Sequence, residues 1–140
     1  MSSDAQSLSD LFHEFIGTDS NTLLMQERIK SISNNPDYYI AVACNGNEIV
    51  GTAMAIVCYD IVGNCNPYLL VENVVISNRY RGQGIGKLLM KDIEDFGQEH
   101  HCNYVFLVSG NNREDAHKFY ESIGYIGNSK GFRKRFKNQI

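Results

Sequence analysis

Several features that would identify other classes of protein are missing from this sequence of 140 residues. It has two prolines, no internal repeat, and no tract of proline, glycine or serine that is long enough to be a linker. No run approaches the ~18 apolar residues that a membrane span requires. The formal net charge of −3 lacks the positive excess on which general binders of nucleic acid and of anionic membranes depend. We therefore expect one domain over residues 1–140, with neither nucleic acid nor a membrane as partner.

The four cysteines also lack the spacing of a metal or disulfide framework. Cys44, Cys58, Cys65 and Cys102 form no CxxC pair, and their separation is typical of neither a zinc site nor a small disulfide-bonded domain. We expect free thiols in a reducing compartment, and no metal. The first ten residues are polar and acidic, without the basic and apolar regions of a secretion signal. Together these observations predict a cytoplasmic protein.

Hydrophobic periodicity and turn residues predict a mixed α/β domain. We expect helices over residues 7–16, 21–33, 84–99 and 113–123, and strands over residues 38–43, 48–59, 68–76, 104–108, 125–127 and 132–136. The triplet Asn45-Gly46-Asn47 between the first two strands favours a hairpin, because Asn and Gly tolerate positive φ. The order of elements places a strand–helix–strand unit at the centre of the fold.

Burial can be expected for two strands and one helix face. The segment 68–76 is apolar on both faces, which is typical of a central strand, and we expect 104–108 to be a buried strand as well. In the helix over 84–99, the residues at inward-facing spacing are Ile85, Leu88, Leu89, Ile93 and Phe96.

A glycine-rich segment, residues 79–87, joins the central strand to this helix. Glycines at alternate positions, 82, 84 and 86, let the backbone turn tightly and approach a ligand closely. Exposed N–H groups at the start of a helix favour phosphate oxygens, and Arg81 and Lys87 add positive charge. The segment therefore predicts a phosphate site, with a tight turn that binds nothing as the alternative.

Two common nucleotide motifs do not fit this segment. A P-loop would place glycine at position 81, which is arginine, and serine or threonine at position 88, which is leucine. A dinucleotide-binding fingerprint that starts at Gly84 would require a third glycine at position 89, which is leucine. We therefore expect neither nucleotide fold.

The pattern R-x-x-G-x-G, formed by Arg81, Gly84 and Gly86, resembles the first signature of the GCN5-related N-acetyltransferase (GNAT) family. Residues 117–125, HKFYESIGY, resemble the second signature, and the similarity spans roughly residues 68–136. It implies a central mixed, mostly antiparallel and partly splayed β-sheet flanked by about four helices. Two features depart from the family: no strand-like segment precedes Ser7, and Arg113 stands where many members have asparagine.

The resemblance implies an enzyme that transfers an acetyl group from acetyl-CoA to a primary amine of a small molecule or peptide. The amine would attack directly in a ternary complex. The loop would cradle the pyrophosphate of acetyl-CoA, and the neighbouring strand would hold its pantetheine arm. The implied acetyl-CoA contacts are Val74, Ile76, Arg81, Gly82, Gln83, Gly84, Ile85, Gly86, Lys87, Asn111, Arg113, His117 and Tyr120.

Two residues are candidates for catalysis. Glu72 is the only charge in the apolar run 68–76, and burial there would raise its pKa toward that of a general base, although a purely structural carboxylate is the alternative. By family resemblance, backbone N–H groups around Val74 would stabilise the oxyanion. Tyr120 would protonate the departing thiolate, with a plain core aromatic as the alternative. No cysteine lies in either motif, so we expect no covalent intermediate.

Three other readings stay open. A non-catalytic acyl-CoA sensor would keep the loop and lose the chemistry. The segment around the loop also resembles glucosamine-phosphate acetyltransferases, which makes an amino-sugar phosphate a possible acceptor. The basic stretch 130–137 would suit nucleic acid, but the acidic overall balance argues against it. Homodimers are frequent in the family, so a homodimer is a further expectation.

Overall fold

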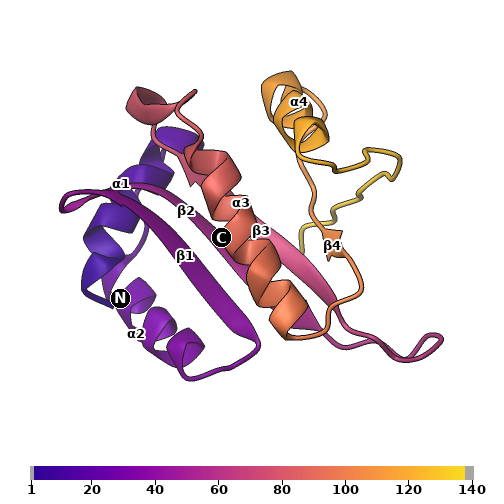
Figure 1. The fold of residues 1–140 in the computed structure, drawn as a ribbon. Helices are drawn as coiled ribbons and strands as arrows, with labels where there is room; N and C mark the ends of the chain where they lie inside the picture. The colour runs from indigo at the N-terminus through magenta and orange to yellow at the C-terminus, as the bar shows by residue number, and fades with distance from the viewer. Residues whose placement is uncertain (1, 138–140) are drawn as a thin grey trace. The chain divides into compact units, whose positions relative to one another are not determined.

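The computed structural model describes residues 2–137, which divide after Leu107 into an N-terminal and a C-terminal unit. The N-terminal unit contains η1 (Ser2–Asp4), α1 (Ala5–Ile16), α2 (Thr22–Ser33), β1 (Tyr38–Asn45), β2 (Glu48–Cys58), β3 (Tyr68–Ile76), η2 (Asn78–Tyr80), α3 (Ile85–Glu99) and β4 (Val105–Phe106). The C-terminal unit contains α4 (Glu114–Ser122) (Figure 1). The expectation of one domain over the whole chain stays a prediction. No helix among the described residues is long and apolar enough to cross a membrane.

The predicted helices are confirmed, and local signals set their ends. α1 stops at Gly17, whose φ of 77° is left-handed and whose N–H donates to the carbonyl of His13 over 2.9 Å. α2 starts after Asn21, whose side-chain oxygen accepts a hydrogen bond of 3.1 Å from the N–H of Leu24. These ends fix where the two helices lie along the sheet.

The four strands form one sheet in the order β1-β2-β3-β4. β1 and β2 are an antiparallel hairpin that turns at Gly46, where φ is 62°. β2 and β3 are antiparallel, whereas β3 and β4 are parallel. The predicted mixed, mostly antiparallel sheet with 68–76 in its interior is therefore confirmed.

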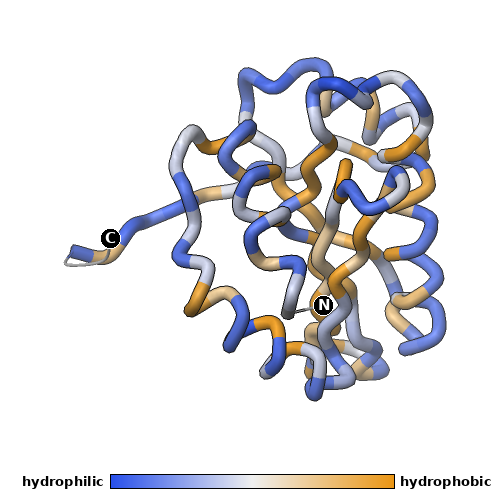
Figure 2. Tube along the Cα trace, turned by 90° about the vertical axis from the view of Figure 1, so that its left-hand side faces the viewer, coloured by the Kyte–Doolittle hydropathy of each residue, from blue (hydrophilic) through white to orange (hydrophobic). Residues whose placement is uncertain are grey.

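Helices cover both faces of this sheet, and Figure 2 shows how hydrophobic and hydrophilic residues alternate along them. On one face, Leu8 and Leu11 of α1 and Ile29 of α2 form a cluster with Val75 of β3. On the other face, α3 buries Leu89, Met90 and Ile93. Because Gly97 has no side chain, α3 approaches β3 closely, and a Cβ at Gly97 would lie 2.9 Å from Leu69. This packing places β3 between a layer formed by α1 and α2 and a layer formed by α3.

The C-terminal part of the sequence departs from expectation. The predicted strand 104–108 is only the two residues of β4, and Phe106 is 39% exposed. The predicted strands 125–127 and 132–136 are wrong, because the described residues after α4 contain no strand. Alternation in a sequence indicates which side chains would share a face, but a strand also requires a neighbour with which to pair. Phe132 is 90% exposed, so the alternating apolar residues of this segment do not form a buried face.

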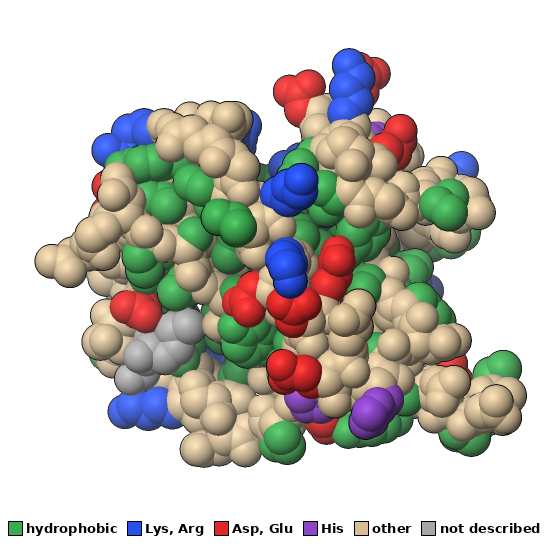
Figure 3. All heavy atoms as spheres, viewed as in Figure 1, with side chains coloured by type: hydrophobic (Ala, Val, Ile, Leu, Met, Phe, Trp, Pro, Cys, Tyr) green, Lys and Arg blue, Asp and Glu red, His purple; other side chains and the backbone are tan. Residues whose placement is uncertain are grey.

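One predicted inward-facing residue of α3 is not buried. Leu88 is 70% exposed, whereas the others at the predicted positions are buried or half-buried. It lines a hollow beside the end of β1, and this space leaves its side chain exposed. The outward side of α3 carries mixed charges, including a Lys91–Asp95 ion pair, and blue and red side chains gather over the helix at the centre of Figure 3.

Tyr39 connects β1 to α3, and this contact gives a pH-dependent prediction. Its hydroxyl donates a 2.6 Å hydrogen bond to Asp92 and its ring stacks on Phe96 at 5.0 Å. The bond to the Asp92 carboxylate, with burial, raises the pKa of Tyr39 from 10.0 to about 12. A raised folded-state pKa means that the stabilisation is complete below pH 10 and disappears as the pH rises to about 12.

We expect Tyr39→Phe to lower the free energy of unfolding by about 1 kcal/mol at neutral pH, because it removes the hydrogen bond and keeps the ring. Urea unfolding of both proteins measures this difference, which should shrink between pH 10 and about 12. A difference that stays constant over that range would contradict the assignment.

Candidate active site

The central feature of the N-terminal unit is a β-bulge in β3. Thr52 pairs with Val75 and Met54 pairs with Glu72, so two residues of β3, Asn73 and Val74, stand opposite one residue of β2. Asn73 adopts a left-handed φ of 57°, which asparagine tolerates better than other residues with a side chain. A left-handed residue inside a central strand is uncommon, and here it marks the position where the regular hydrogen bonding between β2 and β3 is interrupted.

The bulge changes which residues of β3 face α3 and which face α1 and α2. Before it, Leu69 packs against α3. After it, Val75 packs on the α1–α2 side, and Ile76 turns toward the α3 side, where its side chain lies beside Gly51. Without the extra residue, alternation would place Val75 on the same face as Leu69. The apolar run that predicted a central strand gave no signal of this reversal.

The pairing of β3 with β4 ends before the bulge. The two strands pair only at Leu69 with Val105 and at Leu70 with Phe106. From residue 72 to residue 76, the β4-side edge of β3 has no strand beside it among the described residues. Backbone groups on an unpaired strand edge can bind an extended ligand in the manner of an added strand. Val74 and Ile76, both half-buried, lie in this open part of the edge.

Glu72 lies immediately before the bulge, and its surroundings differ from expectation. It is exposed, so the burial that would have prepared it as a base is absent from this structure. Because Glu72 pairs directly with Met54, the two side chains share the sheet face that α1 and α2 cover. Its carboxylate is therefore accessible to water and to a ligand on that face.

The glycine loop follows β3 and opens α3. Gly82 and Gly84 both have left-handed φ, 78° and 79°. Gly84 is the residue before α3, and no side chain caps the first turn of the helix there. A Cβ at Gly84 would meet no protein atom within 4 Å, so the space above this turn is open. The exposed cations Arg81 and Lys87 flank it, which is an arrangement that suits phosphate oxygens.

Polar contacts from distant parts of the chain hold this loop. Arg79 forms an ion pair with Glu48 of β2, and the hydroxyl of Tyr80 donates to the same carboxylate over 3.0 Å. The side-chain amide of Asn45 donates to Tyr80 over 3.2 Å. Glu14 of α1 accepts from the N–H of Asn78 over 3.1 Å. Sequence reasoning missed Glu14, Asn45 and Glu48, because nothing in their local pattern indicates a contact more than thirty residues away.

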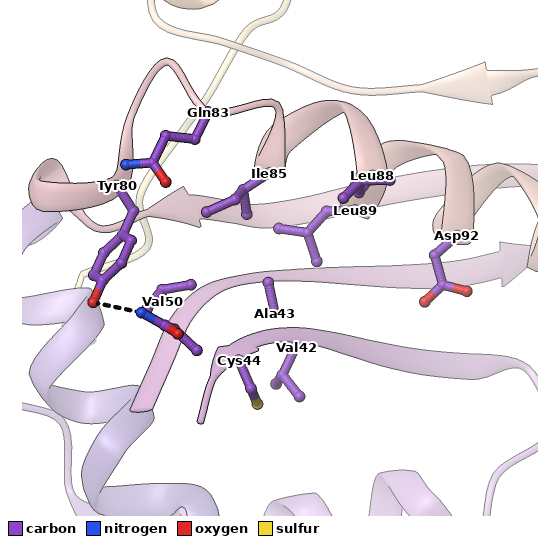
Figure 4. Close-up of a pocket in the computed structure, with 11 residues that line it drawn as sticks. Val42, Ala43, Cys44, Val50, Tyr80, Gln83, Ile85, Leu88, Leu89 and Asp92 are labelled. Carbon is purple, nitrogen blue, oxygen red and sulfur yellow. Dashed lines mark hydrogen bonds between the residues drawn. The ribbon is translucent and has the colours of Figure 1, made fainter. Parts of the chain in front are cut away.

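Two hollows lie on opposite faces of the sheet. The first, which we call the loop pocket, has a volume of about 500 Å³ and lies between α3 and the β1–β2 hairpin. Figure 4 shows Tyr80 and Gln83 of the loop at one end and Asp92 of α3 at the other. Of the residues expected to contact acetyl-CoA, Gln83 and Ile85 line this pocket.

The second hollow, which we call the α2 pocket, has a volume of about 490 Å³. It lies between the two N-terminal helices and the face of the sheet that carries the bulge. Its lining residues are Leu8, Phe12, Asn21, Leu24, Met25, Arg28, Ile29, Ile32, Tyr38, Ile40, Thr52, Met54, Ile56 and Asn73. Asn73 places the bulge at the wall of this pocket, next in sequence to Glu72.

The remaining predicted residues lie in the C-terminal unit. Tyr120 of α4 is half-buried and packs edge-on against Phe119 and Tyr125, at ring distances of 5.2 and 5.8 Å. Burial raises the pKa of Tyr120 above its usual value of 10.0, and the charge of Arg113 partly opposes this. The hydroxyl therefore keeps its proton at neutral pH, as an acid must.

The turn before α4 brings together the predicted positions 111–117. The ring Nε2 of His117 lies 2.7 Å from the carbonyl of Gly110, and the N–H of Arg113 donates to the same carbonyl over 3.1 Å. Ser109, next to this turn, has a buried hydroxyl without a hydrogen-bond partner among the described residues. Buried polar atoms are usually paired, so this hydroxyl is an exception among them.

Comparison with known proteins places this geometry in a family. Residues 5–125 match the model of the acetyltransferase (GNAT) family. The chain is 30% identical over 136 residues to a probable glucosamine 6-phosphate N-acetyltransferase of Drosophila melanogaster, in a match that covers 94% of this chain and 59% of that relative. It is also 28% identical over 102 residues to glucosamine 6-phosphate N-acetyltransferase 1 of Dictyostelium discoideum. That match covers 71% of this chain and 63% of the relative, so the chain spans less than two thirds of the length of both relatives.

A solved structure has a similar fold. A putative acetyltransferase of Agrobacterium tumefaciens superposes with a TM-score of 0.88 at 26% identity, covering 97% of this chain and 96% of the other. The bulged and splayed strand, the glycine loop and the helix that follows thus lie within the stretch that both the family model and this structure share. The chain belongs to the GNAT family of acetyltransferases.

Proposed function

We propose that this chain is an N-acetyltransferase that moves the acetyl group of acetyl-CoA to a primary amine by direct attack in a ternary complex. The observation that carries the proposal is the open edge of β3 at its bulge, immediately before an uncapped, glycine-rich start of α3. An extended arm can lie along such an edge while its phosphates meet the helix start. Membership of the GNAT family supports the same assignment.

Acetyl-CoA would bind through backbone groups and two cations. Its pyrophosphate would lie against the N–H groups of residues 82–87, with Arg81 and Lys87 nearby. The pantetheine arm would pair with the edge of β3 at Val74 and Ile76. By family resemblance, Asn111, Arg113 and His117 of the C-terminal unit would add further contacts. An aminoglycoside N-acetyltransferase of the same fold, with a TM-score of 0.81 and 14% identity over 96% of this chain and 90% of that one, was solved in complex with CoA.

The protein must supply three things to the reaction: a group that stabilises the oxyanion, a proton acceptor and a proton donor. The amine nitrogen attacks the thioester carbonyl, a C–N bond forms, and the C–S bond breaks as the CoA thiolate leaves. A backbone N–H at Val74 would stabilise the oxyanion. Glu72, which water reaches in this structure, would accept the proton of the acceptor ammonium through a water molecule. Tyr120 would donate its proton to the thiolate.

Steady-state kinetics test the proposal. With acetyl-CoA and a reactive amine both varied, we expect free thiol and acetylated amine in equal amounts, and initial-rate lines that intersect. Glu72→Gln should lower kcat by about 100-fold near neutral pH, because it removes the proton acceptor. Glu27→Gln, an exposed glutamate of α2 outside the α2 pocket, is the matched control and should keep the wild-type rate. Parallel lines would contradict direct attack, and an unchanged rate in Glu72→Gln would remove Glu72 as the base.

A further inference from the structure

We infer that the α2 pocket binds the acceptor, and that it selects a primary amine with an apolar body and an anionic group over an amino-sugar phosphate. This inference rests on the proposed function and names the acceptor class of the same site. The name of the Drosophila relative would suggest a sugar phosphate. The lining of this pocket points to a different class.

The face of α2 that meets the pocket is apolar and unfilled. Its lining residues, Asn21, Leu24, Met25, Arg28, Ile29 and Ile32, recur at helical spacing and form one stripe. Within α2, only Ile29 is buried. Leu24 remains 62% exposed, although it lies on the side of the helix that faces the sheet. An apolar stripe that covers a hollow of about 490 Å³ leaves room for an apolar ligand.

The floor of the pocket continues this character. The sheet contributes Ile40, Met54 and Ile56, and α1 contributes Leu8 and Phe12. The volume falls within the range of ~300–1,000 Å³ that is typical of small-molecule sites. Met54 pairs with Glu72 across the strands, so the amine end of a ligand on this floor can reach the bulge.

Five side chains of the lining are polar, and hydrogen bonds engage two of them. The side chain of Asn21 caps α2, and the hydroxyl of Thr52 donates 2.7 Å to the carbonyl of Ala41. Arg28 is the only charged residue in the lining, and no hydrogen bond or ion pair engages it among residues 2–137. A guanidinium beside an apolar hollow is complementary to a carboxylate or a similar anion.

A sugar phosphate would bind poorly in such a pocket. Its ring hydroxyls would leave water for apolar side chains and lose their hydrogen bonds, and each unpaired group costs about 1–3 kcal/mol. Besides Arg28, only Asn73 at the bulge and the hydroxyl of Tyr38 in β1 remain in the lining to replace those bonds. An apolar body loses no hydrogen bonds on entry and gains by burial.

Matched amines and matched variants test the inference. The amines are phenylalanine, 4-(aminomethyl)benzoate, their neutral analogues phenethylamine and benzylamine, and glucosamine 6-phosphate. Equilibrium binding by calorimetry and acetyl transfer by thiol release are both measured. We expect at least one of the two anionic amines to exceed its neutral analogue by about tenfold in affinity and in kcat/KM, equivalent to ~1.4 kcal/mol.

The variants separate the pocket from the rest of α2. Arg28→Gln should remove the advantage of the anionic amine and leave its neutral analogue unchanged, whereas Lys30→Gln, on the same helix but outside the lining, should change neither. Leu24→Asn should weaken both amines, while Leu23→Asn, 73% exposed and outside the lining, should not. All four side chains are exposed, so the fold should tolerate each change.

The two proposals fail in different ways. Preference for glucosamine 6-phosphate, or Arg28→Gln affecting anionic and neutral amines equally, would overturn the acceptor class while acetyl transfer stands. Absence of thiol release with every amine would contradict the proposed function. In that case calorimetry still tests whether the α2 pocket binds the amine. Binding of an anionic amine that Arg28→Gln weakens would support the site, and absence of binding would refute it.

Discussion

Replacement of Gly84 by valine is expected to weaken acetyl-CoA binding by about 100-fold or more, equivalent to at least ~2.7 kcal/mol. Gly84 has a left-handed φ of 79° immediately before α3, and the space above it is free of protein atoms within 4 Å. A branched side chain would occupy the space that the phosphates require and would disfavour the backbone conformation that presents the N–H groups. Calorimetric titration with acetyl-CoA measures the loss.

A second glycine separates this effect from backbone strain. Gly63 lies in the loop between β2 and β3 with a φ of 61°, and a Cβ there would likewise meet no protein atom within 4 Å. Gly63→Val should therefore carry a similar strain of ~1–2 kcal/mol in the folded state and still bind acetyl-CoA normally. If both variants bound acetyl-CoA equally well, the glycine loop would be only a turn.

Replacement of Tyr120 by phenylalanine is expected to lower kcat by about 100-fold and to leave the affinity for acetyl-CoA nearly intact. The change removes one hydroxyl and keeps the ring that packs on Phe119 and Tyr125. Because burial raises the pKa of Tyr120 above 10.0, the hydroxyl can donate a proton throughout the neutral range. Single-turnover thiol release, with calorimetric binding on the same samples, separates the two effects.

Tyr125→Phe is the matched control, since it removes a hydroxyl from the ring next to Tyr120. It should turn over like the wild-type protein. Rescue of Tyr120→Phe by a smaller, more acidic leaving thiol would strengthen the assignment, because such a thiolate needs no proton. Equal rates for Tyr120→Phe and the wild type would make Tyr120 a packing residue.

Elements with strong local signals were predictable from the sequence. The strand 68–76 was predicted with the ends that the structure has, and α1 ends at the glycine that was expected to close it. The Asn45-Gly46-Asn47 turn joins β1 and β2 as expected. In each case the signal lies within a few residues of the feature, as a φ preference or an alternation.

Features that depend on distant partners were not predictable. The bulge at Asn73 arises from the register between β2 and β3, and Glu72 beside it is exposed although β3 lies inside the sheet. Leu88 fits the inward stripe of its helix, yet it lines the loop pocket and stays 70% exposed. The roles of Glu72 and Tyr120 were proposed from family resemblance, and they stay predictions that the variants above decide.

Calorimetric titration of acetyl-CoA into the wild-type protein tests the central claim most directly. The claim is that the open edge of β3 and the uncapped start of α3 together form an acetyl-CoA site. We predict saturable binding with one molecule per chain and a micromolar dissociation constant, weakened by added CoA and by Gly84→Val. Absence of binding, or binding that Gly84→Val leaves unchanged, would contradict the account.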